Sequence, residues 1–353
     1  MKGALILGDG TVIHGQGFGY CGQSFGELVF NTSMIGYQEA LTDPSYAGQI
    51  LILTYPLVGN YGINKFDNES SKSHVRGFVI RSLSTDFSHR SAQKSLNQFL
   101  MDEKVPTVCG IDTRFLVRHI REKGVMPCAI VTSDSEIDSK KILEKLNFDY
   151  SCEDFVSKVT PKSIKVFNKG APKKVALLDF GAKGGIVAEL VKRNLEVHVL
   201  PSTTPSKEIL AIEPDGLMLS NGPGDPSILT YAHKTITELG GKLPIFGICL
   251  GNQLLSHAFG GDTFKLKFGH RGSNHAVLEL KTNKVSITTQ NHGFAVGKIP
   301  KGFEVSHINL NDKTIEGLEN PNLDIFSVQY HPEARPGPHD SGYLFDKFVK
   351  RFS

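Results

Sequence analysis

The segment Pro244-Ile245-Phe246-Gly247-Ile248-Cys249-Leu250-Gly251-Asn252-Gln253 decides the fold of the second half of this chain. Its apolar run stops at Cys249, with a glycine two residues before and another two residues after, and a helical pattern follows. This arrangement predicts a sharp strand-to-helix turn that presents a reactive cysteine. The glycines fit because so tight a turn brings backbones close together. The helix N-terminus can stabilise a thiolate and an oxyanion. The alternative is a buried cysteine that only ends a strand.

Strands and helices alternate on both sides of this segment. We expect strands at residues 175–179, 197–200, 217–220, 244–248 and 324–328, and helices at 186–193, 206–212 and 231–238. The alternation predicts an α/β fold with a doubly wound, mostly parallel sheet in a domain spanning residues 173–353. Ligands of such sheets collect at the carboxyl ends of the strands, where Asp179, residues 221–225 and Cys249 fall.

The first part of the chain has a different texture. Short apolar runs at residues 4–7, 27–31 and 49–55 predict strands, and the spacing at 91–101 and 112–123 predicts helices. We therefore expect a β-rich α+β domain at residues 1–150. Residues 151–172 are polar and lysine-rich without periodicity, and we interpret them as a linker.

The composition is that of an ordinary globular chain. The 353 residues suggest about two domains. The net charge of +3 is spread without a long basic block, so nucleic acid is not an expected partner. Five cysteines form no CxxC pair. The apolar run at the start is too short for a signal peptide, and no stretch is long enough to span a membrane. These features favour a reduced, cytoplasmic enzyme.

A base for Cys249 is available near the end of the chain. Gln329-Tyr330-His331-Pro332-Glu333-Ala334 follows the last expected strand. On extended chain His331 and Glu333 point to the same side, so Glu333 can orient the imidazole while its other nitrogen faces a thiol. A histidine taken alone is more often structural. The pairing with Glu333, downstream of the cysteine turn, favours catalysis.

Two polar segments have open interpretations. Residues 221–226 are either a simple turn or a loop whose N–H groups join that of Leu250 in an oxyanion hole. Residues 290–294, Gln-Asn-His-Gly-Phe, are either a polar turn or a pocket wall for a polar substrate.

Cofactor motifs are weak. Gly17-x-Gly19-x-x-Gly22 resembles a dinucleotide fingerprint, but a strand-like run follows instead of a helix, so we expect a glycine-rich hairpin. No Walker A motif occurs. The spacing of His270, His275 and His292 fits no standard zinc site. We expect neither a metal nor a cofactor in this chain.

The motifs Gly-Ile-Cys-Leu-Gly, Asn-Gly-Pro-Gly-Asp-Pro and His-Pro-Glu-Ala together resemble those of class I, triad-type glutamine amidotransferases. That resemblance implies hydrolysis of L-glutamine to glutamate and ammonia, with Cys249 as nucleophile and His331 and Glu333 completing the triad. It further implies a glutamine pocket, whose residues would be Ser45, Gly222, Gly224, Leu250, Gln253, Asn291, Gly293 and Phe294.

The N-terminal half narrows the family. Residues 30–39, 41–46, 54–62 and 110–114, with 267–272 and 336–340 downstream, resemble carbamoyl-phosphate synthase small chains. The resemblance implies a heteromer with a large chain, which uses ATP and Mg²⁺ to make carbamoyl phosphate from bicarbonate and the ammonia, for arginine or pyrimidine synthesis. Because Ser45 lies in the N-terminal domain, the pocket is expected to close over the cleft between the domains.

Two positions call for comment. The family commonly has His where this chain has Asn252, which bears on how glutamine is held. Lys183 is retained, and our hypothesis is that it supports the charge of Glu333.

Two alternative functions are a glutaminase subunit serving another synthase and a non-catalytic regulatory subunit. The N-terminal half argues against the first, and the intact triad argues against the second.

Overall fold

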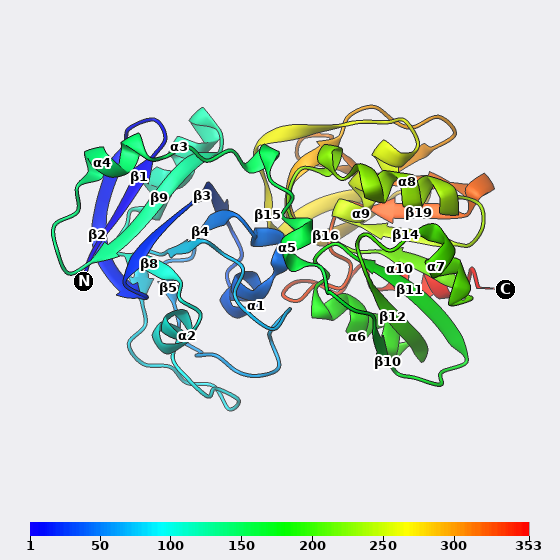
Figure 1. The fold of residues 1–353 in the computed structure, drawn as a ribbon, viewed down its shortest axis with the longest axis horizontal. Helices are drawn as coiled ribbons and strands as arrows, with labels where there is room; N and C mark the ends of the chain where they lie inside the picture. The colour runs from blue at the N-terminus through cyan, green and yellow to red at the C-terminus, as the bar shows by residue number, and fades with distance from the viewer. Residues whose placement is uncertain (353) are drawn as a thin grey trace. The chain divides into compact units, whose positions relative to one another are not determined.

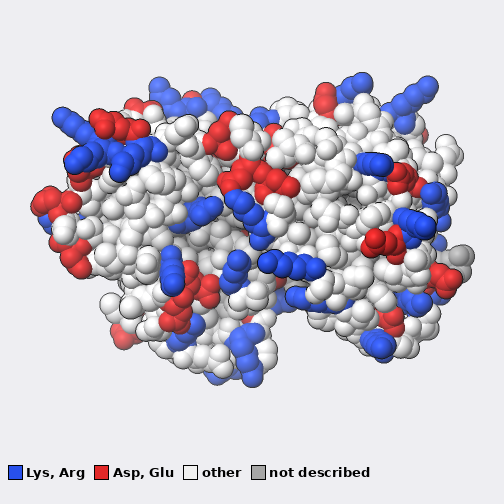
Figure 2. Space-filling view, in the orientation of Figure 1, with Lys and Arg blue, Asp and Glu red and all other residues white. Residues whose placement is uncertain are grey.

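The computed structural model describes residues 1–352 and divides the chain into two compact units, Met1–Glu153 and a second that begins at Asp154. Figure 1 traces both units along the chain. None of the helices within residues 1–352 has the length and apolar character that a bilayer crossing requires. Figure 2 shows basic and acidic side chains intermingled on the face in view, as the small net charge leads one to expect.

The first unit is built on a closed barrel, whose strands follow the order β1-β2-β8-β6-β4-β3-β9. The pairs β3–β4, β4–β6 and β6–β8 are parallel, and the other pairs are antiparallel. The barrel strands are β1 (Lys2–Leu7), β2 (Val12–Gly19), β3 (Gly22–Asn31), β4 (Gln49–Leu53), β6 (Gly77–Val79), β8 (Pro106–Cys109) and β9 (Met126–Ser133). The expected strands belong to this barrel, but its closure was not predicted because short strands do not reveal their partners.

Short elements surround the barrel. They are α1 (Tyr37–Thr42), η1 (Pro44–Tyr46), α2 (Leu96–Asp102), α3 (Thr113–Lys123), α4 (Ser139–Glu144), and the two-stranded pair β5 (Leu57–Val58) with β7 (Ser82–Leu83). Helix α3 begins after Asp112, whose carboxylate accepts the Phe115 N–H at 2.9 Å, a typical N-cap. The strand-like run after Gly22 is confirmed as β3. The hairpin expectation was wrong, because β2 pairs with β1 and β8 and not with β3.

The second unit contains a ten-stranded sheet in the order β10-β12-β11-β13-β14-β19-β18-β16-β15-β17. Its five central parallel strands confirm the predicted doubly wound architecture: β11 (Lys173–Asp179), β12 (Leu195–Pro201), β13 (Gly216–Leu219), β14 (Ile245–Ile248) and β19 (Ile325–Val328). The sheet is less parallel than expected, because four antiparallel strands extend it beyond β19: β15 (Thr263–Glu279), β16 (Lys284–Val296), β17 (Glu304–Asn309) and β18 (Ile315–Asn320).

The segment interpreted as a linker has structure of its own. It contains η2 (Tyr150–Cys152), α5 (Val156–Val159) and β10 (Lys165–Phe167). Strand β10 pairs antiparallel with β12 and so forms one edge of the sheet. All three residues of β10 are exposed, which is why the polar sequence carried no periodic signal.

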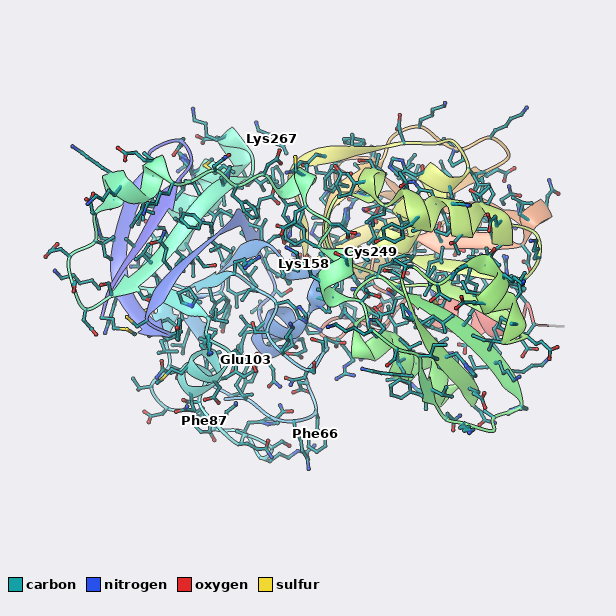
Figure 3. All side chains as sticks on the ribbon, viewed as in Figure 1. Phe66, Phe87, Glu103, Lys158, Cys249 and Lys267 are labelled. Atoms are coloured by element: carbon teal, nitrogen blue, oxygen red, sulfur yellow. The ribbon has the colours of Figure 1, made fainter. Side chains whose placement is uncertain are left out.

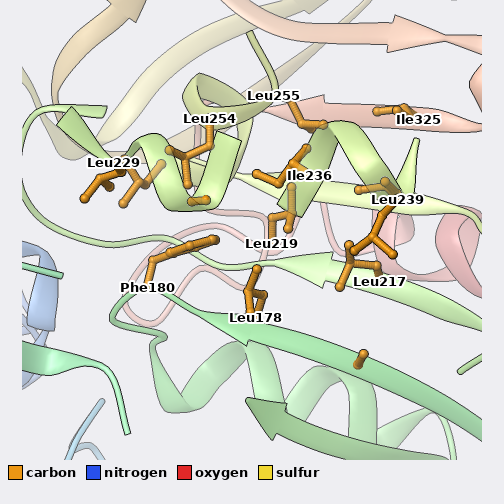
Figure 4. Close-up of a cluster of buried hydrophobic side chains, with 14 of the residues drawn as sticks. Leu178, Phe180, Leu217, Leu219, Leu229, Ile236, Leu239, Leu254, Leu255 and Ile325 are labelled. Carbon is orange, nitrogen blue, oxygen red and sulfur yellow. The ribbon is translucent and has the colours of Figure 1, made fainter. Parts of the chain in front are cut away.

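Helices cover both faces of the parallel strands. Alternate strand residues enter two different cores, as the pleat of a β-strand requires. Leu178, Leu217 and Leu219 pack with α7 (Ser206–Ala211), α8 (Thr230–Leu239) and α9 (Leu250–Ala258), in the cluster drawn in Figure 4. Leu177 and Met218 pack on the opposite face with α6 (Gly184–Lys192) and α10 (Tyr343–Val349). Strand β14 and helix α9, which meet at Cys249, both contribute residues to the first of these cores.

Candidate active site

Cys249, labelled in Figure 3, lies between β14 and α9. Its backbone has φ 54° and ψ −103°, a conformation that a non-glycine residue rarely adopts. Such strain concentrates at functional sites, where the surrounding structure imposes it. The residue is only 2% exposed. The predicted sharp strand-to-helix turn is therefore present, and Cys249 is its strained residue.

The two glycines beside Cys249 are required by close packing. A Cβ added to Gly247 would lie 2.8 Å from the Gly251 carbonyl carbon and 2.8 Å from Leu255 Cδ1. A Cβ added to Gly251 would lie 2.4 Å from the Leu219 oxygen. Real side chains do not approach backbone this closely, so both positions accept only glycine without a shift of the backbone.

His331 and Glu333 lie together in a turn after β19, and not on extended chain as expected. The His331 N–H donates to the Thr289 carbonyl at 2.9 Å, which ties this turn to β16. His331 Nδ1 and Glu333 Oε1 are 2.7 Å apart, and both residues are buried. Because the carboxylate accepts, Nδ1 carries a proton, as an orienting contact requires. The predicted contact between His331 and Glu333 is therefore present, although a turn and not an extended strand brings the two side chains together.

The charges of this pair are strongly coupled. Burial lowers the pKa of His331, but the Glu333 carboxylate and the Cys249 sulfur outweigh burial and raise that pKa to about 10. Burial raises the pKa of Glu333, but Lys183 and His331 outweigh it and lower that pKa to about 2. His331 Nε2 makes no hydrogen bond within residues 1–352. Glu333 is therefore held ionised, and the Cys249 sulfur is near enough to His331 to influence its charge.

Lys183 supplies the cation for Glu333, as hypothesised from the sequence. It lies just before α6 and is 3% exposed. Its Nζ is 3.1 Å from Glu333 Oε1 and donates to the Ala334 carbonyl at 2.9 Å. Its backbone N–H donates to the Asn221 side chain at 3.0 Å. One residue thus connects the histidine–glutamate turn to the loop that follows β13.

The loop after β13 packs directly against the cysteine turn. A Cβ added to Gly222 would lie 2.2 Å from the Phe180 oxygen and 2.8 Å from Leu250 Cδ2. Gly224 follows with φ +96°. The N–H groups of Gly222 and Leu250 form no hydrogen bond with the part of the chain that the structure describes. Two unused donors on adjoining segments can serve a developing oxyanion.

The segment at residues 290–294 is part of strand β16 and not a turn. Cys249 Sγ lies 3.6 Å from the Asn291 carbonyl oxygen. Gln253 Nε2 donates to the Phe294 carbonyl at 2.8 Å. Gly293 lies between them, with Arg271 Nη2 3.3 Å from its Cβ position. The structure therefore brings these three residues of the expected pocket beside the cysteine and α9.

Ser45, the remaining expected pocket residue, belongs to the first unit. It lies in η1, is buried, and its N–H donates to Asp43 Oδ1 at 2.9 Å. This Asx-type contact fixes the short turn that presents Ser45.

Asn252 is fully buried and bonded to residues near β19. Its Nδ2 donates to Gln329 Oε1 at 3.2 Å, and Ser327 Oγ donates to its Oδ1 at 2.8 Å. Gln329 Oε1 also accepts from Gln253 Nε2 at 3.1 Å. Gln329 is a site-positioning residue that the sequence analysis missed. Its only signal was a polar residue two positions before His331.

Comparison with known proteins relates both units to described families. A family model described as glutamine amidotransferase class-I matches residues 176–351, and one described as the carbamoyl-phosphate synthase small chain, CPSase domain, matches residues 5–130. A carbamoyl phosphate synthase small chain of Methanocaldococcus jannaschii is 50% identical over 99% of both chains. One from Clostridium acetobutylicum is 46% identical over 99% of both. A pyrimidine-specific small chain of Bacillus subtilis is 48% identical, over 99% of this chain and 96% of its own.

Proposed function

The chain belongs to the carbamoyl phosphate synthase small chains, and we propose that Cys249, His331 and Glu333 are the triad with which it hydrolyses glutamine. The observation that carries this assignment is the 2.7 Å contact between His331 Nδ1 and Glu333 Oε1, in a turn whose histidine interacts with the Cys249 sulfur. A nucleophile, a base and an orienting carboxylate in this relation are what covalent acyl transfer needs.

The reaction begins with proton transfer from Cys249 to His331. The thiolate attacks the side-chain amide carbon of glutamine, and a tetrahedral intermediate forms. His331 then gives the proton to the leaving nitrogen, the C–N bond breaks, and ammonia departs. His331 next accepts a proton from water, which attacks the γ-glutamyl thioester. The C–S bond then breaks, His331 returns the proton to the sulfur, and glutamate and the thiol are released. Glu333 stays ionised throughout and stabilises the imidazolium form of His331.

The oxyanion of each tetrahedral intermediate is assigned to the N–H groups of Leu250 and Gly222. Both lack hydrogen-bond partners within residues 1–352, and both border the cysteine turn. Such donors stabilise charge that develops only in the transition state. Asn291, Gly293 and Phe294 on β16 then form one wall of the glutamine pocket, and Gln253 and Gly224 border it. Ser45 is proposed to contact glutamine from the first unit.

The ammonia is proposed to pass to a large chain, since a small chain implies such a partner. The large chain would use ATP and Mg²⁺ to form carbamoyl phosphate from bicarbonate. The glutaminase step proposed for this chain requires no cofactor, because the triad supplies both the nucleophile and the proton transfers. We propose a heterodimer as the basic assembly, acting in the cytoplasm.

The two alternative functions are less well supported. The match of residues 5–130 to the small-chain domain argues against a glutaminase of another synthase. The buried triad argues against a non-catalytic regulatory subunit. Its ionised Glu333 stabilises the positive charge of His331, and a non-catalytic subunit would not require that pairing.

The test is to combine the chain with a matching large chain and to measure carbamoyl phosphate formed from glutamine and from ammonia. Cys249→Ser should abolish glutamine-dependent synthesis and spare ammonia-dependent synthesis. Cys152→Ser is the matched control, because that cysteine is exposed and should leave both activities unchanged. Glutamine-dependent synthesis that survives Cys249→Ser would refute the nucleophile assignment.

A further inference from the structure

The antiparallel part of the second unit's sheet buries a polar cluster that the glutaminase chemistry does not use. His270 on β15 and His292 on β16 are cross-strand partners, and Glu316 lies on β18. One potential ligand atom from each of the three lies within 4.8 Å of the others, and all three residues are buried. We propose that His270, His292 and Glu316 bind one divalent metal ion of the zinc type.

The hydrogen bonds of the two histidines fix which nitrogen of each ring carries a proton. His292 Nδ1 is 2.7 Å from the Phe294 carbonyl oxygen, and His270 Nε2 is 2.8 Å from Asp312 Oδ2. Carbonyl and carboxylate oxygens accept, so both nitrogens are donors. In a neutral ring the other nitrogen then has a lone pair. Histidines that bind metals donate their second N–H to a carboxylate or a carbonyl in this way.

The two remaining nitrogens lack a suitable hydrogen-bond donor. His270 Nδ1 makes no hydrogen bond within the described chain and lies 3.7 Å from Glu316 Oε1. His292 Nε2 lies 2.9 Å from Gln290 Oε1, and Gln290 Nε2 donates to Glu316 Oε2 at 2.9 Å. A bare ring nitrogen and an amide oxygen at that distance repel each other. Turning the amide over would only move the conflict to the carboxylate of Glu316. The arrangement between His292 Nε2 and Glu316 therefore lacks one proton or one cation.

A divalent metal ion meets that requirement, because both rings are buried, with His270 7% and His292 5% exposed, and the potential ligand atoms of the cluster already lie within 4.8 Å of one another. A neutral ring is what a metal ligand must be. Gln290 Oε1 would then supply a fourth ligand, and the carboxylates of Glu316 and Asp312 would balance the charge of a divalent ion.

The ligand types select the class of metal. Two imidazoles with carboxylate and amide oxygens suit zinc, whereas magnesium and calcium prefer oxygen alone. Zinc–nitrogen bonds of about 2.0–2.1 Å place neighbouring ligand atoms roughly 3.4 Å apart, so the side chains must draw together slightly on binding. The ion would join β15, β16 and β18 beside Asn291 and Phe294. This proposed site differs from the expectation that the chain binds no metal. That expectation was based on the spacing of histidines along the sequence, which gives no indication that Glu316 lies beside them.

The test is metal binding by the full chain after chelator treatment and dialysis, and it does not depend on glutaminase activity. Equilibrium dialysis against Zn²⁺ alone should give one tightly bound ion per chain. His270→Gln and Glu316→Gln should each weaken binding about 100-fold or more, and Asp312→Asn about 10- to 100-fold. His275→Gln is the control, because its ring lies 5.2 Å from that of His270 but outside the ligand set.

Two measurements on the unaltered chain keep the proposal testable if the variants do not fold. Bound Co²⁺ should show the visible absorption of a four-coordinate ion, and Zn²⁺ but not Mg²⁺ should raise the melting temperature. The proposal is overturned by a six-coordinate Co²⁺ spectrum, by the absence of stoichiometric Zn²⁺, or by wild-type affinity in both ligand variants. It is also overturned if nitrogen NMR of the Zn²⁺-treated chain finds both ring nitrogens of His292 protonated.

Discussion

Lys183 and Glu333 form a buried ion pair, with Nζ 3.1 Å from Oε1, at the same carboxylate oxygen that receives the His331 N–H. Both side chains are almost fully enclosed. A charge in such a place is stable only with its partner. His331, the proposed base, is therefore oriented by a carboxylate whose own ionisation depends on a lysine more than a hundred residues earlier in the chain.

Lys183→Met should lower the glutamine-dependent rate and spare the ammonia-dependent rate. Removing one partner of a buried pair leaves an uncompensated charge, which typically costs about 3–5 kcal/mol of folding free energy. The pKa of Glu333 should rise as well, because Lys183 is a main cause of its depression. Steady-state kinetics and urea unfolding measure both effects.

The matched control is Lys192→Met, since Lys192 is 74% exposed on the surface of α6. Its unfolding free energy should stay within about 0.5 kcal/mol of wild type. If Lys183→Met left glutaminase activity unchanged, the supporting role of Lys183 would be disproved.

Gly251→Ala should abolish glutamine hydrolysis and lower stability. The new Cβ would meet the Leu219 oxygen at 2.4 Å, so β13 and α9 must separate and Cys249 must move. Overpacking of this kind costs about 1–3 kcal/mol, and more where backbone blocks the way. Gly342→Ala is the control, because its Cβ would meet nothing nearer than 3.6 Å. Equal melting temperatures for the two variants would contradict the packing argument.

The sequence could predict the parallel core, the turn at Cys249 and the contact between His331 and Glu333, because all three have local signatures. Two glycines close to Cys249 in the sequence predict its sharp turn. The strands of the core appear in the sequence as continuous apolar runs. The antiparallel extension could not be predicted in the same way. Strands β15 and β16 are rich in polar residues, and several of these, including Gln290 and His292, are buried. Their burial is stabilised by hydrogen bonds between strands, which no pattern within one strand reveals.

The site was predictable only where its residues lie close together in sequence. His331 and Glu333 were paired correctly, although a turn, and not a strand, brings them together. Gln329 was not identified, because its role depends on contacts with distant segments. Lys183 was identified through a resemblance to a family, and not from its neighbours in the sequence.

Asn252→Leu should destabilise the chain and weaken glutamine binding. The leucine keeps a similar volume, but it removes the 2.8 Å acceptor of the Ser327 hydroxyl, which is left with the longer contact to the Leu318 carbonyl at 3.4 Å, and it leaves Gln329 Oε1 with one donor fewer. Buried polar groups left unpaired cost about 1–3 kcal/mol. Because Gln253 shares the same acceptor, KM for glutamine should rise more than kcat falls. A lower kcat with unchanged KM would assign Asn252 to the chemical step instead.

The stability contributed by Glu333 should depend on pH in a defined window. Its pKa is about 2 in the folded chain, below the ordinary value of 4.5, so its ionised form stabilises the fold. That contribution is complete above pH 4.5 and is lost as pH falls from there toward 2. His331 acts in the opposite direction. Its pKa is about 10 in the folded chain, above the ordinary value of 6.5, so its contribution is complete below pH 6.5 and is lost as pH rises toward 10.

Urea unfolding of wild type and Glu333→Gln over this range measures both contributions. The wild-type advantage should be greatest between about pH 4.5 and 6.5 and decline on either side. A difference that stays constant from acid to alkaline pH would show that the pair is not coupled to folding.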